Sequence, residues 1–164
     1  DLDNLPVETG TFTKDVQTVT YKYIKLRPYE LFVRYTVEDG DNDQAKFMVK
    51  FKDTQINDYT TNGELKIGDI ELTDLEKVTY TLYETETPEF CDPVITETHP
   101  AVVELEGTLN TVANKYEYIA NYEEISGFNV IIDEANQKVI FYPFRGVLIF
   151  ILYIDCFISN TPRK

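Results

Sequence analysis

The sequence predicts an all-β protein, either an antiparallel up-and-down β-barrel of about 8 to 10 strands or, as the alternative, a two-sheet β-sandwich. Three observations lead to this prediction. Apolar residues recur at every second position through much of the 164-residue chain. Turn-forming residues separate these stretches, and no stretch has a convincing helical period. Sheets without helices bury their apolar faces by closing into a barrel or by pairing with a second sheet.

The alternating stretches locate the strands in chain order. Each has Val, Ile, Tyr, Phe or Leu on one side and mostly polar residues on the other, a composition that fits a pleated surface. Residues 29–38 are the clearest case, with Tyr29, Leu31, Val33, Tyr35 and Val37 on one side. Alternation of this kind covers residues 19–23, 29–38, 47–51, 78–82, 103–105, 116–122 and 128–132.

Turn signals fall between the predicted strands and favour antiparallel hairpins. They are residues 39–43, Asn62–Gly63, Ser126–Gly127, residues 134–136 and Arg145–Gly146, of which Asn–Gly is the strongest short hairpin signal. Thr73 and Glu76 have the spacing of a helix capping box, but the β-branched and aromatic residues after them limit a helix to one turn. Because no linker or repeat interrupts the chain, we expect residues 1–164 to form a single domain.

The run from Val147 to Ile158 is apolar except for Asp155. Its twelve residues are fewer than the roughly 20 that a membrane-spanning helix needs. A twelve-residue helix would be apolar on all sides and would need a surrounding core of other helices. We therefore expect a buried strand that closes the sheet and is covered on both faces, and we expect no membrane association.

Two cysteines, Cys91 and Cys156, occur in the chain, which starts with Asp1 as a mature secreted protein does after loss of its signal peptide. An even pair in an extracellular protein is more often a disulfide than two free thiols. A Cys91–Cys156 disulfide would fasten the acidic loop 84–100 to the C-terminal strand. The alternative is a pair of buried, reduced cysteines in a cytosolic protein.

The net charge of −14 is distributed unevenly. Residues 1–52 carry a net −1, residues 53–134 a net −16, and residues 135–164 a net +3. Nucleic acids and anionic lipids bind proteins that supply cations, so neither is an expected partner. A cationic small molecule or a basic protein fits this charge.

The residues needed for catalysis are scarce. The chain has one histidine, His99, and two serines, Ser126 and Ser159, so a nucleophile with an adjacent base is not expected. Zinc would require more His or Cys ligands than the chain contains. The sequence also has no glycine motif for phosphate. We expect no enzyme activity, no cofactor and no metal.

Twelve tyrosines and ten phenylalanines are the other compositional feature. Several tyrosines lie on the apolar side of their strands, where each hydroxyl needs a hydrogen-bond partner. Water or a ligand in a cavity would provide that partner more readily than a sandwich core would. The predicted cavity lining is Tyr21, Tyr35, Phe47, Tyr80, Tyr118 and Tyr122, with loop 84–100 at its mouth.

One segment resembles a known family. Residues 113–122, Ala-Asn-Lys-Tyr-Glu-Tyr-Ile-Ala-Asn-Tyr, with the hairpin into residues 128–133, are similar to the polar-Asp-Tyr segment that opens the seventh strand of lipocalins, particularly the salivary and haemolymph forms of arthropods. The resemblance covers about twenty residues. It implies an eight-stranded barrel with a central cavity for a small apolar or amine ligand.

Two functions follow from these observations. The first is a secreted binding protein that sequesters or carries a small hydrophobic or cationic, amine-like molecule in a β-barrel cavity. The second is an acidic β-sandwich interaction module that captures a basic protein through residues 53–134.

Overall fold

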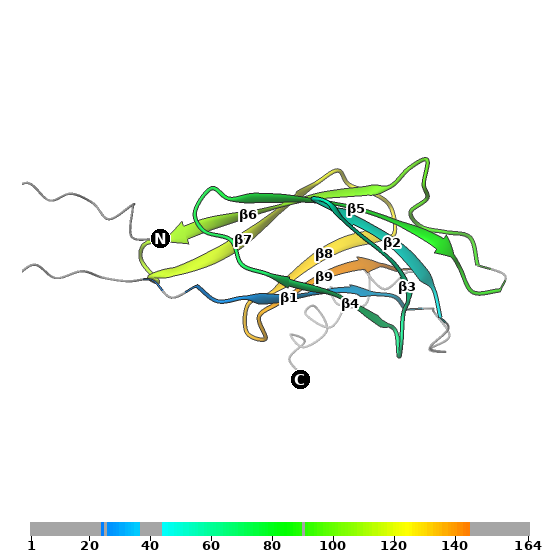
Figure 1. Cartoon of the computed structure of the whole chain (residues 1–164), viewed down its shortest axis with the longest axis horizontal. Coiled ribbons are helices and arrows are strands. Elements are labelled where there is room, and N and C mark those ends of the chain that lie inside the picture. The colour runs from blue at the N-terminus through cyan, green and yellow to red at the C-terminus, as the bar shows by residue number, and fades with distance from the viewer. Residues whose placement is uncertain (1–23, 25, 37–43, 90, 145–164) are drawn as a thin grey trace, which may run out of the picture.

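The chain forms two β-sheets that lie as separate layers (Figure 1). A computed structural model describes residues 24, 26–36, 44–89 and 91–144. The four-stranded sheet has the order β4 (Glu64–Ile70), β1 (Tyr29–Arg34), β9 (Lys138–Pro143), β8 (Phe128–Asp133). The five-stranded sheet has the order β3 (Thr54–Tyr59), β2 (Lys46–Phe51), β5 (Lys77–Glu86), β6 (Ala101–Asn110), β7 (Lys115–Tyr122).

The all-β class is confirmed, and the described strands correspond to the sandwich alternative, because the two sheets are not closed into a barrel. Strands β3 and β7 are the edges of one sheet, and β4 and β8 are the edges of the other. Within the described residues, none of these edge strands forms a ladder with an edge of the opposite sheet. The short connections β3–β4 and β7–β8 instead carry the chain from one layer to the other.

The interior lies between the sheets and is filled in large part by the alternating residues that the sequence identified, together with residues of β4 and β9 that it did not. In β1, Tyr29, Leu31 and Val33 are buried, and the intervening residues are partly exposed. One buried cluster includes side chains from both sheets, such as Val49 and Val139. Strand β3 did not stand out in the sequence because it is an edge strand, and its residues are exposed except for a half-buried Ile56.

Two bulges preserve this inward pattern. Opposite β1, Leu31 pairs with Gly68 and Phe32 with Lys66, so Ile67 is the additional residue of β4. The shift lets Ile67 and Ile70 both be buried although three positions separate them. In β5, Thr85 is the additional residue, which follows the buried Glu84.

Two expectations about pairing need correction. The turn at Asn62–Gly63 forms, with backbone φ angles of 52° and 76°, but it does not make a hairpin. Strands β3 and β4 lie in different sheets and are joined only by the isolated bridge Thr61↔Glu64. The sheets are also not wholly antiparallel, because β1 and β9 pair in parallel.

Several predicted features lie outside the described residues. These are the strand at residues 19–23, the turns at residues 39–43 and Arg145–Gly146, and the apolar run 147–158. The capping-box residues are described, and they form a single turn, as predicted. The Glu76 carboxylate accepts a hydrogen bond from the Thr73 N–H at 2.7 Å, and the Glu76 N–H donates to the Thr73 carbonyl.

This turn lies against β6 at Gly107. The Leu75 N–H donates to the Gly107 carbonyl, and the Gly107 N–H donates to the Glu76 carbonyl, at 2.8 and 2.9 Å. A Cβ atom at position 107 would lie 2.1 Å from the Thr73 carbonyl oxygen. The close approach of two backbones therefore requires glycine here.

Replacing Gly107 with alanine should destabilise the protein by roughly 1–3 kcal/mol, because the backbone of the 71–76 connection has to move away. The free energy of unfolding in urea measures this. Val102→Ala, at a position on the same strand that is 48% exposed, should change it by less than about 0.5 kcal/mol. Equal effects of the two substitutions would contradict the close-approach interpretation.

Candidate interaction surface

The residues predicted to line a cavity are packed against other side chains. Tyr35 and Phe47 are buried, and their ring centroids lie 5.9 Å apart in an edge-to-face contact. Tyr80 packs between Phe51 and Phe141, at 5.0 and 5.3 Å. Burial raises the pKa of Tyr80 to about 12.

Tyr118 and Tyr122 obtain hydrogen bonds from the protein itself. The Tyr118 hydroxyl donates to the Ile70 carbonyl at 3.2 Å and accepts from the Leu72 N–H at 3.1 Å. The Tyr122 hydroxyl donates to the Asn129 side-chain oxygen at 2.6 Å and accepts from the Val130 N–H. These two tyrosines are therefore compatible with a sandwich, because backbone and amide groups provide the partners that cavity water would otherwise supply.

The remaining predicted residue, Tyr21, lies outside the described residues. A surface hollow of about 270 Å³ lies before β1 and is lined by Leu26, Arg27, Pro28 and Gln137. None of the five described residues of the predicted lining belongs to it. The described members of the predicted lining thus belong to the one buried cluster between the sheets, with Tyr122 packed against it.

Carboxylates define the alternative site, and their contacts separate them into three groups. Residues 53–134 contain 19 acids and three lysines. Each of those lysines is shared by two carboxylates, as for Lys66 with Glu30 and Asp69. With Arg34 and Lys46 included, seven of the 19 acids form ion pairs: Glu64, Asp69, Glu86, Glu104, Glu106, Glu117 and Glu134.

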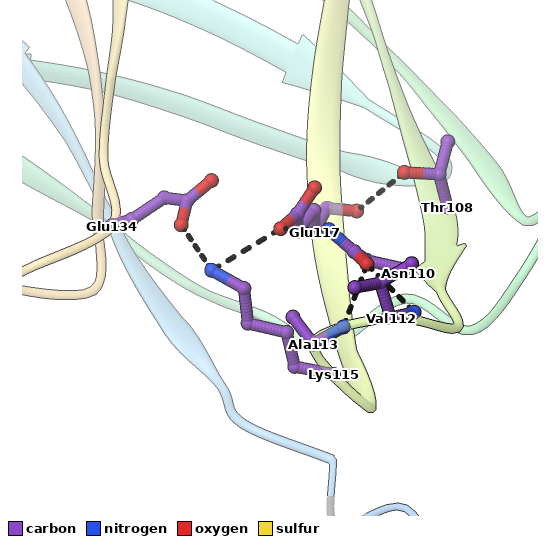
Figure 2. Close-up of polar contacts among 7 residues, drawn as sticks. All are labelled: Thr108, Asn110, Val112, Ala113, Lys115, Glu117 and Glu134. Carbon is purple, nitrogen blue, oxygen red and sulfur yellow. Dashed lines mark hydrogen bonds and ion pairs between the residues drawn. The ribbon is translucent and has the colours of Figure 1, made fainter.

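Figure 2 shows one of these shared lysines. Lys115 on β7 contacts Glu117 on the same strand at 3.2 Å and Glu134 in the turn between β8 and β9, so it links the two sheets. Asn110 donates from its amide to Glu117, and its oxygen accepts from the backbone of the β6–β7 turn. The Asn110 hydrogen bond and Lys115 lower the pKa of Glu117. This cluster is saturated by internal contacts and serves the fold.

A second group of five acids accepts hydrogen bonds from nearby backbone groups. Asp58 accepts from the N–H of the following residue, Asp74 from the Leu109 N–H, and Asp133 from the Asn136 N–H. Glu76 and Glu84 complete the group, accepting from Thr73 and from Val94 and Ile95. These contacts fix turns and loops.

The third group makes no ion pair or backbone hydrogen bond among the described residues. It contains seven acids, of which Asp53 and Glu71 lie apart. The other five, which we call the acidic end, lie in the β5–β6 and β7–β8 connections and are all exposed: Glu89, Asp92, Glu97, Glu123 and Glu124. Both connections lie at the same end of the sandwich, because Leu82 pairs with Ala101 and Val103 pairs with Tyr122.

Specific contacts hold the two connections together. Glu84 is buried on the interior side of β5, and its carboxylate accepts hydrogen bonds from the Val94 N–H at 2.7 Å and the Ile95 N–H at 3.3 Å. Ile95 is fully buried in the core. Gly127 lies close enough to Val94 that a Cβ there would be 3.1 Å from its side chain. Figure 1 shows the β5–β6 connection at the right-hand end of the sandwich.

The sequence identified only part of this surface. It marked loop 84–100 as acidic but missed Glu123 and Glu124, which come directly after β7. It also missed Glu84 as the residue that anchors the loop. Both had a usable signal: Glu84 continues the alternation of Val78, Tyr80 and Leu82, and no lysine or arginine occurs between Lys77 and Lys115 or between Lys115 and Lys138.

The residues that could serve catalysis or metal binding are not grouped into a site in the described structure. His99 and Ser126 are both exposed, and the His99 ring contacts the Thr98 hydroxyl in the same loop at 3.1 Å. Among the described residues, no three His, Cys, Asp or Glu side chains are grouped so that they could hold a metal ion. The part of the chain that the structure describes also contains no helix long and apolar enough to cross a membrane.

Cys91 is half-buried and is a free cysteine in the described structure. Its carbonyl accepts a hydrogen bond from the Thr87 hydroxyl at 2.8 Å, and its N–H donates to the Pro88 carbonyl. Cys156 lies outside the described residues. The Cys91–Cys156 disulfide thus stays a prediction.

Comparisons with protein-family models, with curated proteins and with solved structures found no significant match to the chain. The resemblance to lipocalins therefore stays a prediction, and the interpretation of function depends on the geometry above.

Replacing Tyr118 with phenylalanine should lower the free energy of unfolding by roughly 2 kcal/mol, because it leaves the Leu72 N–H and the Ile70 carbonyl without this partner. Urea unfolding monitored by circular dichroism measures the change. Tyr122→Phe is the matched control, since its hydroxyl bonds an exposed asparagine and its loss should cost less. If the two substitutions cost the same, the Tyr118 hydroxyl has no special role between the layers.

The Glu117 cluster predicts a pH-dependent contribution to stability. Because the pKa of Glu117 is lower in the folded protein, its contribution is present above the unfolded pKa of about 4.3 and is lost as the pH falls through the folded pKa. Glu117→Gln should therefore destabilise the protein at neutral pH, and the difference from wild type should shrink near pH 3. Urea unfolding at both pH values measures this.

A suitable control is Glu71→Gln, which removes an exposed carboxylate with no hydrogen bond or ion pair among the described residues. It should leave stability nearly unchanged at either pH. A stability difference for Glu117→Gln that is the same at neutral and acid pH would contradict the assigned role of the carboxylate.

Proposed function

We propose that the protein is a β-sandwich interaction module that captures a basic protein partner through its acidic end. The observation that carries this proposal is that five exposed carboxylates gather in two neighbouring connections and have no cation beside them within the described residues. Charges arranged in this way attract oppositely charged proteins and steer their approach.

The three lysines of residues 53–134 do not neutralise the negative charge of the acidic end. Each lysine of residues 53–134 is already shared by two carboxylates, so each such trio keeps a net negative charge. Among the described residues, no lysine or arginine forms an ion pair with the acidic end, so the cations of a partner can neutralise it. A surface rich in lysine or arginine fits, because release of counterions on contact favours association.

The packing of the predicted cavity residues also favours this function over transport of a small ligand. Tyr35, Phe47, Tyr80 and Tyr118 are each at most 6% exposed, and their rings contact other aromatic rings. Their membership of the buried core supports an interaction function over a ligand-binding wall. The predicted extracellular location is compatible with either function.

Binding of a short oligolysine peptide, measured by fluorescence anisotropy, tests the proposal. Raising the NaCl concentration from about 0.05 to about 0.5 M should weaken binding by more than about tenfold, because exposed charge pairs are screened. The double variant Glu123→Gln/Glu124→Gln should weaken binding by about 3- to 10-fold at low salt.

The matched control is Asp53→Asn/Glu71→Gln, which also removes two exposed charges but lies away from the acidic end. It should weaken binding by less than about twofold. Equal weakening by both double variants would show that binding follows net charge alone, and the proposed surface would then be wrong.

A further inference from the structure

The outer side of the four-stranded sheet carries an apolar row. Phe32 on β1 pairs with Ile140 on β9, and Ile140 pairs with Ile131 on β8. The neighbours of these residues along each strand, such as Val139 and Phe141, belong to the buried cluster between the sheets. Because side chains alternate along a strand, the three residues, which we call the outer apolar row, face away from the sandwich interior.

The row is unusual for an outer sheet face. Ile140 is only 3% exposed although it does not belong to the core cluster between the sheets. Ile131 is 36% exposed, and the Lys138 ammonium lies over the Phe32 ring, 4.8 Å from its centroid. A central β9 position therefore combines an apolar side chain with almost no contact with water, on the side opposite the core.

Further along β9, two aromatic residues continue this face toward the end of the strand. Tyr142 and Phe144 have ring centroids 5.5 Å apart, and alternation places both on the side of Ile140. The Tyr142 hydroxyl shares a 2.7 Å hydrogen bond with the Thr36 hydroxyl. These aromatic residues extend the apolar face from the row to Phe144, the last described residue before the C-terminal run.

The run 147–158 follows Phe144 after two residues and has eleven apolar residues in twelve. Twelve residues span about 18 Å as a helix and about 40 Å as a strand. The six residues of β9 span about 20 Å, so the run could return along most of the outer face as a helix and along all of it as a strand. A segment attached to this face also finds it at a high effective concentration.

We propose that the outer apolar row is a docking site for residues 147–158 of the same chain. Two apolar surfaces that are close in the sequence then cover each other, which accounts for the low exposure of Ile140 and removes the exposed part of Ile131 and the run from water. Three positively charged residues flank the run in the sequence: Arg145, Arg163 and Lys164. Their charge favours docking onto a protein of net negative charge. The inference is independent of the proposed function, because the acidic end is formed by other residues.

Limited chymotrypsin digestion of the full chain, followed by mass spectrometry, tests this docking. Cleavage within residues 147–158 should be at least about tenfold slower in the protein than in a synthetic peptide of residues 145–164, because proteolysis reports the open fraction. Ile131→Glu and Ile140→Glu should each accelerate cleavage in this segment severalfold. Val102→Glu, the same change at an exposed site on β6 of the other sheet, should not.

Circular dichroism identifies any variant that fails to fold. If Ile140→Glu unfolds, the comparison of Ile131→Glu with Val102→Glu decides, since both positions are partly exposed. Cleavage of the wild-type segment as fast as the free peptide overturns the proposal, as does equal cleavage in these two variants. Protection that rises over about a hundredfold range of protein concentration also overturns the proposal and assigns the run to a second copy of the chain. Protection that appears only with phosphatidylcholine vesicles overturns it too and assigns the run to lipid.

Discussion

The two-layer structure depends on filling one interior with side chains from both sheets while giving buried polar groups their hydrogen bonds. Tyr118 meets both requirements. Its ring packs edge-to-face on Tyr29 with centroids 4.5 Å apart, and its hydroxyl bonds the backbone at Ile70 and Leu72. The same residue thus joins β7 of one sheet to β1 and the end of β4 in the other. Burial raises the pKa of the Tyr118 hydroxyl.

The distribution of charge follows from this arrangement. Acids near strand ends and turns are used as hydrogen-bond acceptors, as Asp74 is for the Leu109 N–H, or share a lysine across the two sheets, as Glu134 does. The fold requires those carboxylates. Among the described acids of the β5–β6 and β7–β8 connections, only Glu97 has a hydrogen-bond partner, the Tyr83 hydroxyl at 3.5 Å. These acids gather because Glu84 holds one connection on the core beside the other. The acidic end therefore carries exposed negative charge on connections that contacts with the core hold in place.

The two proposals assign different surfaces to different tasks. The acidic end lies at the loops, where charge is exposed and unpaired among the described residues, and it suits a reversible, salt-sensitive contact. The outer apolar row lies on the four-stranded sheet and suits burial within the chain. A basic partner and an apolar segment could then be bound at the same time, since the sites share no residue.

The sequence by itself determined the all-β class, the inward faces of most strands and the turn at Thr73–Glu76, because alternation and capping act between residues close in the chain. Strands β3, β4 and β9 were missed: β3 because an edge strand buries too little to alternate, β4 because a bulge interrupts its alternation, and β9 because consecutive residues are buried. Only the tertiary structure decided that Asn62–Gly63 joins two sheets, since the local turn chemistry is the same whether or not a hairpin forms. It also decided that β1 pairs in parallel with β9, a contact between residues far apart in the chain. The candidate site, too, was predicted in part from the local sequence and in part only from the tertiary structure. Local composition marked loop 84–100 as acidic, whereas the placement of Glu123 and Glu124 beside it, and of the Tyr118 hydroxyl on a distant backbone, depends on contacts between residues far apart in the chain.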